Sequence, residues 1–230
     1  MTTTDINAAY EVLKREVAEV RDHVREHLIP GTREEELYKG TTILYSELIH
    51  KPDFMFIGIN PGAGFFKSTG IKERAIDLEP CVGFEYINAK EEGYDYALAV
   101  QTRTAFEASK HNECLPKSVK SNLFYTSTSS QNELKEFLYL LIERLDVNYY
   151  AKSIVWTKQL IELVAPKVII CEGAWVVNLL CKYYEVTPVW RSGIAYCTIN
   201  GGISVIGYKR RYSHMLNMDH FVTALNSLSL

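Results

Sequence analysis

Cysteine pairs spaced for metal binding are missing from this chain of 230 residues. The five cysteines are odd in number, and no two of them form a Cys-x-x-Cys pair, the spacing that usually marks structural zinc and iron–sulfur sites. We therefore expect buried free thiols in a reducing compartment, with no metal and no other cofactor. The cysteines are Cys81, Cys114, Cys171, Cys181 and Cys197.

Long apolar runs and a large excess of one charge are missing as well. No apolar run approaches the length of a membrane-spanning helix, and the N-terminal Met-Thr-Thr-Thr-Asp lacks the basic and apolar regions of a secretory signal. We therefore expect a cytoplasmic protein with no membrane partner. Because the formal net charge is −3, any binding to nucleic acid would depend on a local basic patch.

Apolar runs that read as strands alternate with segments of helical period. Strands are expected at 54–59, 122–125 and 167–171, and a hairpin at 194–199 and 203–208. This alternation predicts a three-layer α/β/α fold with a small, mostly parallel central sheet and an N-terminal helix. We expect one domain over residues 1–230, with 1–49 as a helical extension packed on it. Helices are expected at 6–28, 96–110, 131–145 and 149–165, near 173 and near 217.

The most informative segment is Gly58-Ile59-Asn60-Pro61-Gly62, directly after the first strand. Ligands of open α/β sheets bind at the carboxyl ends of strands, so this turn is the expected place for a reactive group. The glycines are expected to supply unusual backbone freedom, and Pro61 restricts the conformation of Asn60. The segment 60–93 shows no clean period and is expected to be a functional loop.

Three further segments follow this turn in a recognisable order. They are Asn122-Leu123, the strand and helix entry at 165–174, and a polar loop with Ser213-His214. Over roughly residues 50–228 this arrangement resembles the uracil-DNA glycosylase superfamily. The first motif is similar to the mismatch-specific uracil/thymine and single-strand-selective branches. In the third, Glu172-Gly173-Ala174 stands in place of the superfamily's usual Leu-Gly-x-x-Ala.

The resemblance implies a metal-independent hydrolase of base excision repair that removes uracil or a related pyrimidine from single- or double-stranded DNA. It implies that Asn60 orients the attacking water and that Asn122 reads the Watson–Crick edge of the flipped base. The alternatives are that Asn60 merely tolerates a turn and that Asn122 bonds to its own backbone. Phe65 and Tyr86 are further candidates for stacking on the base. The expected base-binding residues are Gly58, Ile59, Pro61, Gly62, Phe66, Phe84 and Asn122.

The C-terminal loop lacks the His-Pro-Ser that many superfamily members carry there. Either Arg211 or His214 is expected to act in catalysis, by stabilising the negative charge of the leaving base. The Lys209-Arg210-Arg211 run is the densest basic cluster, and it is expected to contact DNA phosphates. A solvated turn without a partner is the alternative. The residues assigned to DNA binding are Lys209, Arg210, Tyr212 and Ser213, with Tyr212 or Met215 as an apolar wedge.

Two other functions fit the same residues. The first is a catalytically silent member of the superfamily that binds a nucleobase, a nucleotide or a modified DNA end. The second is a small-molecule hydrolase or transferase that uses the same turn for another ligand. A Rossmann dinucleotide site is disfavoured, because Gly58-x-x-x-Gly62 lacks the Gly-x-Gly-x-x-Gly spacing.

Overall fold

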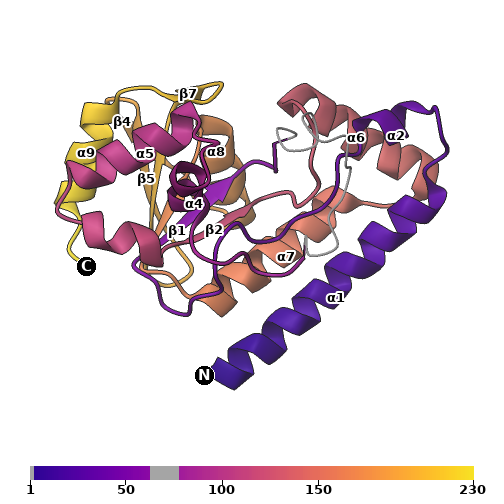
Figure 1. Ribbon diagram of the computed structural model, residues 1–230, viewed down its shortest axis with the longest axis horizontal. Helices are drawn as coiled ribbons and strands as arrows, with labels where there is room; N and C mark the ends of the chain where they lie inside the picture. The colour runs from indigo at the N-terminus through magenta and orange to yellow at the C-terminus, as the bar shows by residue number, and fades with distance from the viewer. Residues whose placement is uncertain (1–2, 63–77) are drawn as a thin grey trace. The chain divides into compact units, whose positions relative to one another are not determined.

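The computed structural model describes residues 3–62 and 78–230 (Figure 1). These residues form two compact units, each assembled from separate stretches of the chain. Within the described residues, unit 1 takes 3–43, 60–62, 78–80 and 122–163. Unit 2 takes 44–59, 81–121 and 164–230.

Unit 2 is organised around a six-stranded sheet in the order β2-β1-β3-β6-β5-β4. Strands β1 (Phe54–Gly58), β3 (Val168–Cys171) and β6 (Ile203–Tyr208) are parallel neighbours. The two strands β5 (Ile194–Ile199) and β4 (Val189–Arg191) continue the sheet in antiparallel fashion. Outside β1 lies β2 (Val119–Asn122), whose last residue belongs to unit 1.

Helices cover both faces of this sheet. On one face, α4 (Glu85–Glu91), α5 (Ala97–Glu107) and α9 (Met218–Ser227) share a buried core with β1, β3 and β6. Figure 1 shows α5 and α9 side by side. On the other face lies α8 (Ala174–Tyr183), which approaches β6 closely at Gly207. The predicted three-layer α/β/α fold with a mostly parallel central sheet and an N-terminal helix is therefore confirmed.

The register of the parallel strands places their carboxyl ends at one edge of the sheet. Ile57 pairs with Cys171, and Cys171 pairs with Gly207. The residues that follow each strand, beginning with Gly58, Glu172 and Tyr208, therefore share this edge.

Unit 1 is built from helices. They are α1 (Thr3–His27), α2 (Arg33–Leu37), α6 (Gln131–Leu145) and α7 (Tyr149–Val164), of which the last residue belongs to unit 2. The start of α6 is fixed by Ser130, whose side chain accepts a hydrogen bond from Glu133 N at 3.2 Å. Glu133 in turn accepts from Ser129 N at 2.9 Å, so that two free backbone donors of this helix end are satisfied.

An ion pair between Glu34 of α2 and Arg144 of α6 ties two helices of unit 1 together. The Glu34 side chain is buried, and Arg144 Nη1 lies 2.6 Å from its Oε1 and 2.8 Å from its Oε2. Burial alone would raise the pKa of Glu34, but hydrogen bonds from its own backbone N–H and from Arg144 lower the pKa below 4.5 overall.

This ion pair makes stability depend on pH. A carboxyl whose pKa is lowered by folding stabilises the folded state above its unfolded pKa, and the contribution is lost as the pH falls through the folded pKa. We expect Glu34→Gln to lower the free energy of unfolding at pH 7 by about 1.5 kcal/mol. The difference should disappear well below pH 4.5. Urea unfolding across this range checks it, and a difference that persists in acid would contradict the ion pair's role.

Three details of the secondary structure differ from the expectations. The second strand was expected at 122–125, but β2 ends at Asn122. The segment 60–93 contains α4, which packs its buried Tyr86 and Ala89 into the core. The basic loop forms a small hairpin, β7 (Arg210–Arg211) with β8 (His214–Met215). Across residues 3–62 and 78–230, no helix is sufficiently long and apolar to cross a membrane.

Candidate functional site

Asn60 lies in the turn after β1, directly after Ile59, and its side-chain amide is held in one orientation. Its Nδ2 donates hydrogen bonds to Pro61 O at 3.1 Å, Thr126 O at 3.3 Å and Thr128 Oγ1 at 3.0 Å. Two of these acceptors are carbonyl oxygens, so the amide nitrogen must face them. Oδ1 accepts no hydrogen bond from the described residues, and the side chain is half-buried. Asn60 thus offers an oriented acceptor to a water or a ligand.

The turn after β1 is held by the Thr/Ser-rich segment that follows β2. Ser127 Oγ lies 3.1 Å from Pro61 O and 3.2 Å from Gly62 O, and Gly62 forms a β-bridge with Thr128. Neither Gly58 nor Gly62 has a positive φ, and a Cβ built at Gly62 would meet no atom within 4 Å. Neither glycine therefore adopts the left-handed conformation that only glycine reaches without strain. Its rigidity comes from neighbouring hydrogen bonds.

Two other predicted base-binding residues are nearly buried at the ends of strands. Ile59 is 8% exposed and follows β1, whereas Asn122 is 6% exposed and ends β2. Among the described residues, no hydrogen bond is formed by the side-chain amide of Asn122. Lys120 lies two residues earlier on the same strand, so its side chain points to the same face as Asn122.

The β7–β8 hairpin brings together the two candidates for the missing histidine. Arg211 and His214 are paired across the hairpin, and both are exposed. Tyr212 lies in the connecting turn with φ of 55° and is 84% exposed, and Ser213 beside it is exposed as well. The alternatives left open by the sequence are therefore neighbours, and a large aromatic side chain projects from the same turn.

The base of this hairpin is anchored to the sheet of unit 2. Arg210 is half-buried, and its side chain packs over Gly173, where a built Cβ would lie 3.5 Å from Arg210 Nε. Lys209 Nζ lies 5.3 Å from the centre of the Trp190 ring, within the range of a cation–π contact. Met215 N donates to Gln101 Oε1 at 2.7 Å. Two of the three basic residues therefore have local partners, and Arg211 has the exposed guanidinium.

A buried polar cluster at the edge of the unit 2 sheet escaped the sequence reasoning. Lys120 Nζ donates to Glu172 Oε2 at 2.8 Å and to Tyr86 OH at 2.7 Å, and Tyr86 OH donates to Glu172 Oε1. The ammonium also lies 4.1 Å from the centre of the Tyr86 ring. The signal available in the sequence was Glu172, a charged residue immediately after a fully buried strand.

Glu85 and Tyr96 extend this cluster. Lys120 Nζ lies 3.6 Å from Glu85 Oε2, and Tyr96 OH donates to Glu85 Oε1 at 2.6 Å. Burial raises the pKa of Glu85, although Lys120 and Tyr96 oppose this effect. Burial and the charge of Glu172 raise the pKa of Tyr86 well above its usual value, so the phenol stays protonated and donates. The cluster therefore surrounds one ammonium with carboxyl and hydroxyl groups.

The aromatic residues proposed to stack on a base fall into two groups: two lie outside the described residues, and two pack in the core. Phe65 and Phe66 lie outside the described residues. Phe84 is 1% exposed, and its ring centre lies 5.4 Å from that of Phe56 and 5.5 Å from that of Tyr86. Packing in the core accounts for Phe84 and Tyr86 without any ligand.

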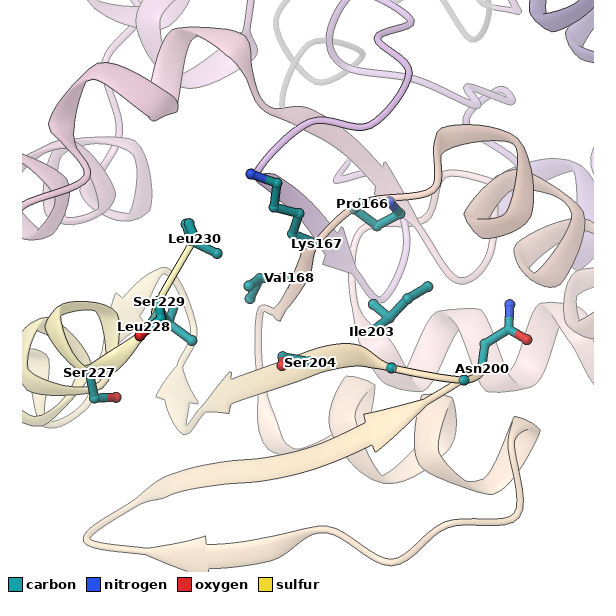
Figure 2. A pocket seen from close by; sticks show the side chains of 12 residues that line it. Pro166, Lys167, Val168, Asn200, Ile203, Ser204, Ser227, Leu228, Ser229 and Leu230 are labelled. Atoms are coloured by element: carbon teal, nitrogen blue, oxygen red, sulfur yellow. The ribbon is translucent and has the colours of Figure 1, made fainter. Parts of the chain in front are cut away.

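A hollow of unit 2 is lined by none of these residues. It has a volume of about 710 Å³ and is open to solvent at the amino ends of β3 and β6. Figure 2 shows its wall, with Asn200 from the β5–β6 turn and Ile203 at the start of β6 on one side and the segment 227–230 on the other. Its one charged side chain, Lys167, is paired with Asp53 at 2.8 Å. Within residues 3–62 and 78–230, no three His, Cys, Asp or Glu side chains are grouped to hold a metal ion.

No model of a known protein family matches this chain, and no curated protein matches it either.

Proposed function

We propose that this protein is a metal-independent DNA glycosylase that hydrolyses the N-glycosidic bond of uracil or a related pyrimidine. The observation that carries the proposal is the orientation of Asn60, whose Nδ2 is bound to three acceptors while Oδ1 accepts no hydrogen bond from residues 3–62 and 78–230. A water that donates to Oδ1 would be held in one position relative to the turn. Positioning of this kind is what an asparagine can supply, because its amide does not usefully take up a proton.

The reaction places specific demands on the remaining residues. The water oxygen forms a bond to C1′ of the sugar while the bond from C1′ to the base breaks, and the electron pair leaves with the base. Negative charge therefore develops on the base, and a cation that faces it lowers the barrier. Arg211 and His214, paired across the exposed hairpin, are the residues we assign to this role.

Base recognition and DNA binding are assigned to two further features. The side-chain amide of Asn122 has both a donor and an acceptor, which the edge of uracil requires. The β7–β8 hairpin concentrates positive charge on a protein whose net charge is −3. Its Tyr212 is an exposed aromatic side chain, the kind of group that inserts between stacked bases. We assign phosphate contact to Lys209 and Arg210, and entry into the base stack to Tyr212.

One assay tests the proposal. The protein is incubated with single- and double-stranded oligonucleotides that contain uracil or mismatched pyrimidines, and abasic sites are then cleaved with alkali. We expect product with the wild type and a loss of about 10²-fold in Asn60→Ala, because the water loses its oriented acceptor. Thr128→Val removes one acceptor of Nδ2 but keeps Oδ1, so we expect it to lose less than about tenfold.

Asn132 provides the matched control, because it is an exposed asparagine on α6. Asn132→Ala should retain full activity, and urea unfolding should show that all variants are folded. Equal activity in Asn60→Ala and the wild type would contradict the role of Asn60. Binding of the oligonucleotides without product would favour the catalytically silent alternative, and neither binding nor product would favour a small-molecule substrate.

A further inference from the structure

Two thiols of unit 2 lie in direct contact. Cys181 Sγ on α8 and Cys197 Sγ on β5 are 3.0 Å apart, and both cysteines are free. Cys181 is 1% exposed, whereas Cys197 is partly exposed. One sulfur of the pair is thus reachable from solvent, and the other lies directly behind it.

The two cysteines are carried by elements that hold them in place. Cys197 sits within β5, where it pairs with Val205 of β6, and β5 is also hydrogen-bonded to β4. Cys181 lies in α8, which packs against both β5 and β6. A disulfide has a sulfur–sulfur distance of about 2.05 Å, so the sulfurs need to close by only about one ångström.

The contact also makes the two thiols chemically different. The hydrogen bond from Cys181 lowers the pKa of Cys197, even though burial opposes this effect. The same hydrogen bond, followed by burial, raises the pKa of Cys181. Since the thiolate is the nucleophilic form, the partly exposed Cys197 is the sulfur that reacts first.

We propose that Cys181 and Cys197 form an oxidisable dithiol that closes to a disulfide in the presence of a hydroperoxide. The Cys197 thiolate attacks the outer oxygen of the peroxide, the O–O bond breaks, and the remaining oxygen leaves as hydroxide or alkoxide. Cys197 is now a sulfenic acid. The Cys181 sulfur then attacks the Cys197 sulfur, the S–O bond breaks, and the oxygen leaves as water with the Cys181 proton. Two thiols have lost two electrons, and the peroxide has taken them up.

The other cysteines lack this arrangement. Cys171 is fully buried, and burial raises the pKa of its thiol. Cys114 Sγ donates to Asp53 Oδ2 at 3.3 Å, and burial and this contact raise its pKa to about 11. Cys81 Sγ donates to Leu44 O at 3.4 Å. Cys114 is therefore a suitable control, because it is partly exposed but its thiol is held protonated.

The disulfide would join α8 to β5 covalently. α8 begins directly after Glu172 and Gly173, so the link fixes the far end of a helix whose start lies at the carboxyl edge of the sheet. Closing this bond removes freedom from the unfolded chain, and we expect the oxidised protein to unfold at a higher urea concentration than the reduced protein.

The experiment treats the reduced full-length chain with hydrogen peroxide and then blocks the remaining thiols. Peptide mapping without reductant should show one Cys181–Cys197 disulfide that dithiothreitol reverses. Cys114→Ser should form the same disulfide. Cys181→Ser should leave a sulfenic acid on Cys197 that a cyclic 1,3-dione captures, whereas Cys197→Ser should give neither product.

Either of two results would overturn the proposal. One is a folded wild type that keeps both thiols under conditions that oxidise small-molecule thiols. The other is a Cys181→Ser variant in which the dione labels Cys114 or Cys81 in preference to Cys197. Both readouts follow sulfur chemistry alone, so they are independent of any glycosylase activity.

Discussion

Replacing Lys120 with methionine should lower the free energy of unfolding by about 3–5 kcal/mol, the range found when one partner of a buried ion pair is removed. The Lys120 and Glu172 side chains are only 7% and 3% exposed, so the substitution leaves a carboxylate in the protein interior without its cation. Tyr86 OH still donates to Glu172, but a neutral hydroxyl cannot replace the ammonium. Urea unfolding followed by circular dichroism measures the loss.

A double variant separates the ion pair from simple packing. In Lys120→Met/Glu172→Gln the carboxylate is gone too, so we expect most of the lost stability to return. Lys182→Met on the exposed end of α8 is the matched control, and it should change stability by less than about 0.5 kcal/mol. If the two changes at Lys120 and Glu172 simply added, the pair would have no energetic coupling and the cluster would be a packing feature.

Gly207→Ala should destabilise the protein by about 3 kcal/mol, the upper part of the usual range for overpacking. A Cβ built at Gly207 would lie 1.9 Å from Val177 Cγ2 and 3.4 Å from Cys171 Cβ. Val177 is β-branched and fully buried, so its side chain has few ways to move aside. The same urea titration measures the change.

Removing the opposing methyl groups should relieve this clash. Gly207→Ala/Val177→Ala is expected to be more stable than Gly207→Ala alone, although Val177→Ala on its own leaves a small cavity. Gly62→Ala is the control, because no atom lies within 4 Å of a Cβ there and its φ is not positive. We expect that control to stay within about 0.5 kcal/mol of the wild type. A tolerated Gly207→Ala would mean that α8 does not pack as closely on β6 as the structure shows.

Local sequence signals predicted much of the fold. Helix α6 was expected at its observed bounds, 131–145, directly after a Thr/Ser-rich turn, and Ser130 of that turn caps the helix. The hairpin around Asn200-Gly201-Gly202 formed where it was predicted, and all three of these residues have a positive φ. In these segments the residues that determine the structure are close together in the sequence. The helix and the hairpin could therefore be predicted from the sequence alone.

The second strand was misplaced because its stability depends on distant residues. The strand was expected from Asn122 to Tyr125, in and beside an apolar run, and Lys120 lies before that segment. In the folded protein Lys120 is buried in β2 because Glu172 and Tyr86 satisfy its charge. The candidate site likewise depends in part on residues that are distant in the sequence. Asn60 could be found from the turn that carries it, but two of the three acceptors that orient it come from 126–128.

The pairing of β1 with β3 has a consequence for the synthesis of this protein. Phe54 pairs with Val168, so β1 leaves the ribosome long before its neighbour on that side exists. All five residues of β1 are buried in the finished sheet, and none is charged. An uncharged, apolar strand with an unpaired edge is the kind that associates with other chains. Until β3 has been made, the nascent chain must therefore keep this edge covered by other means.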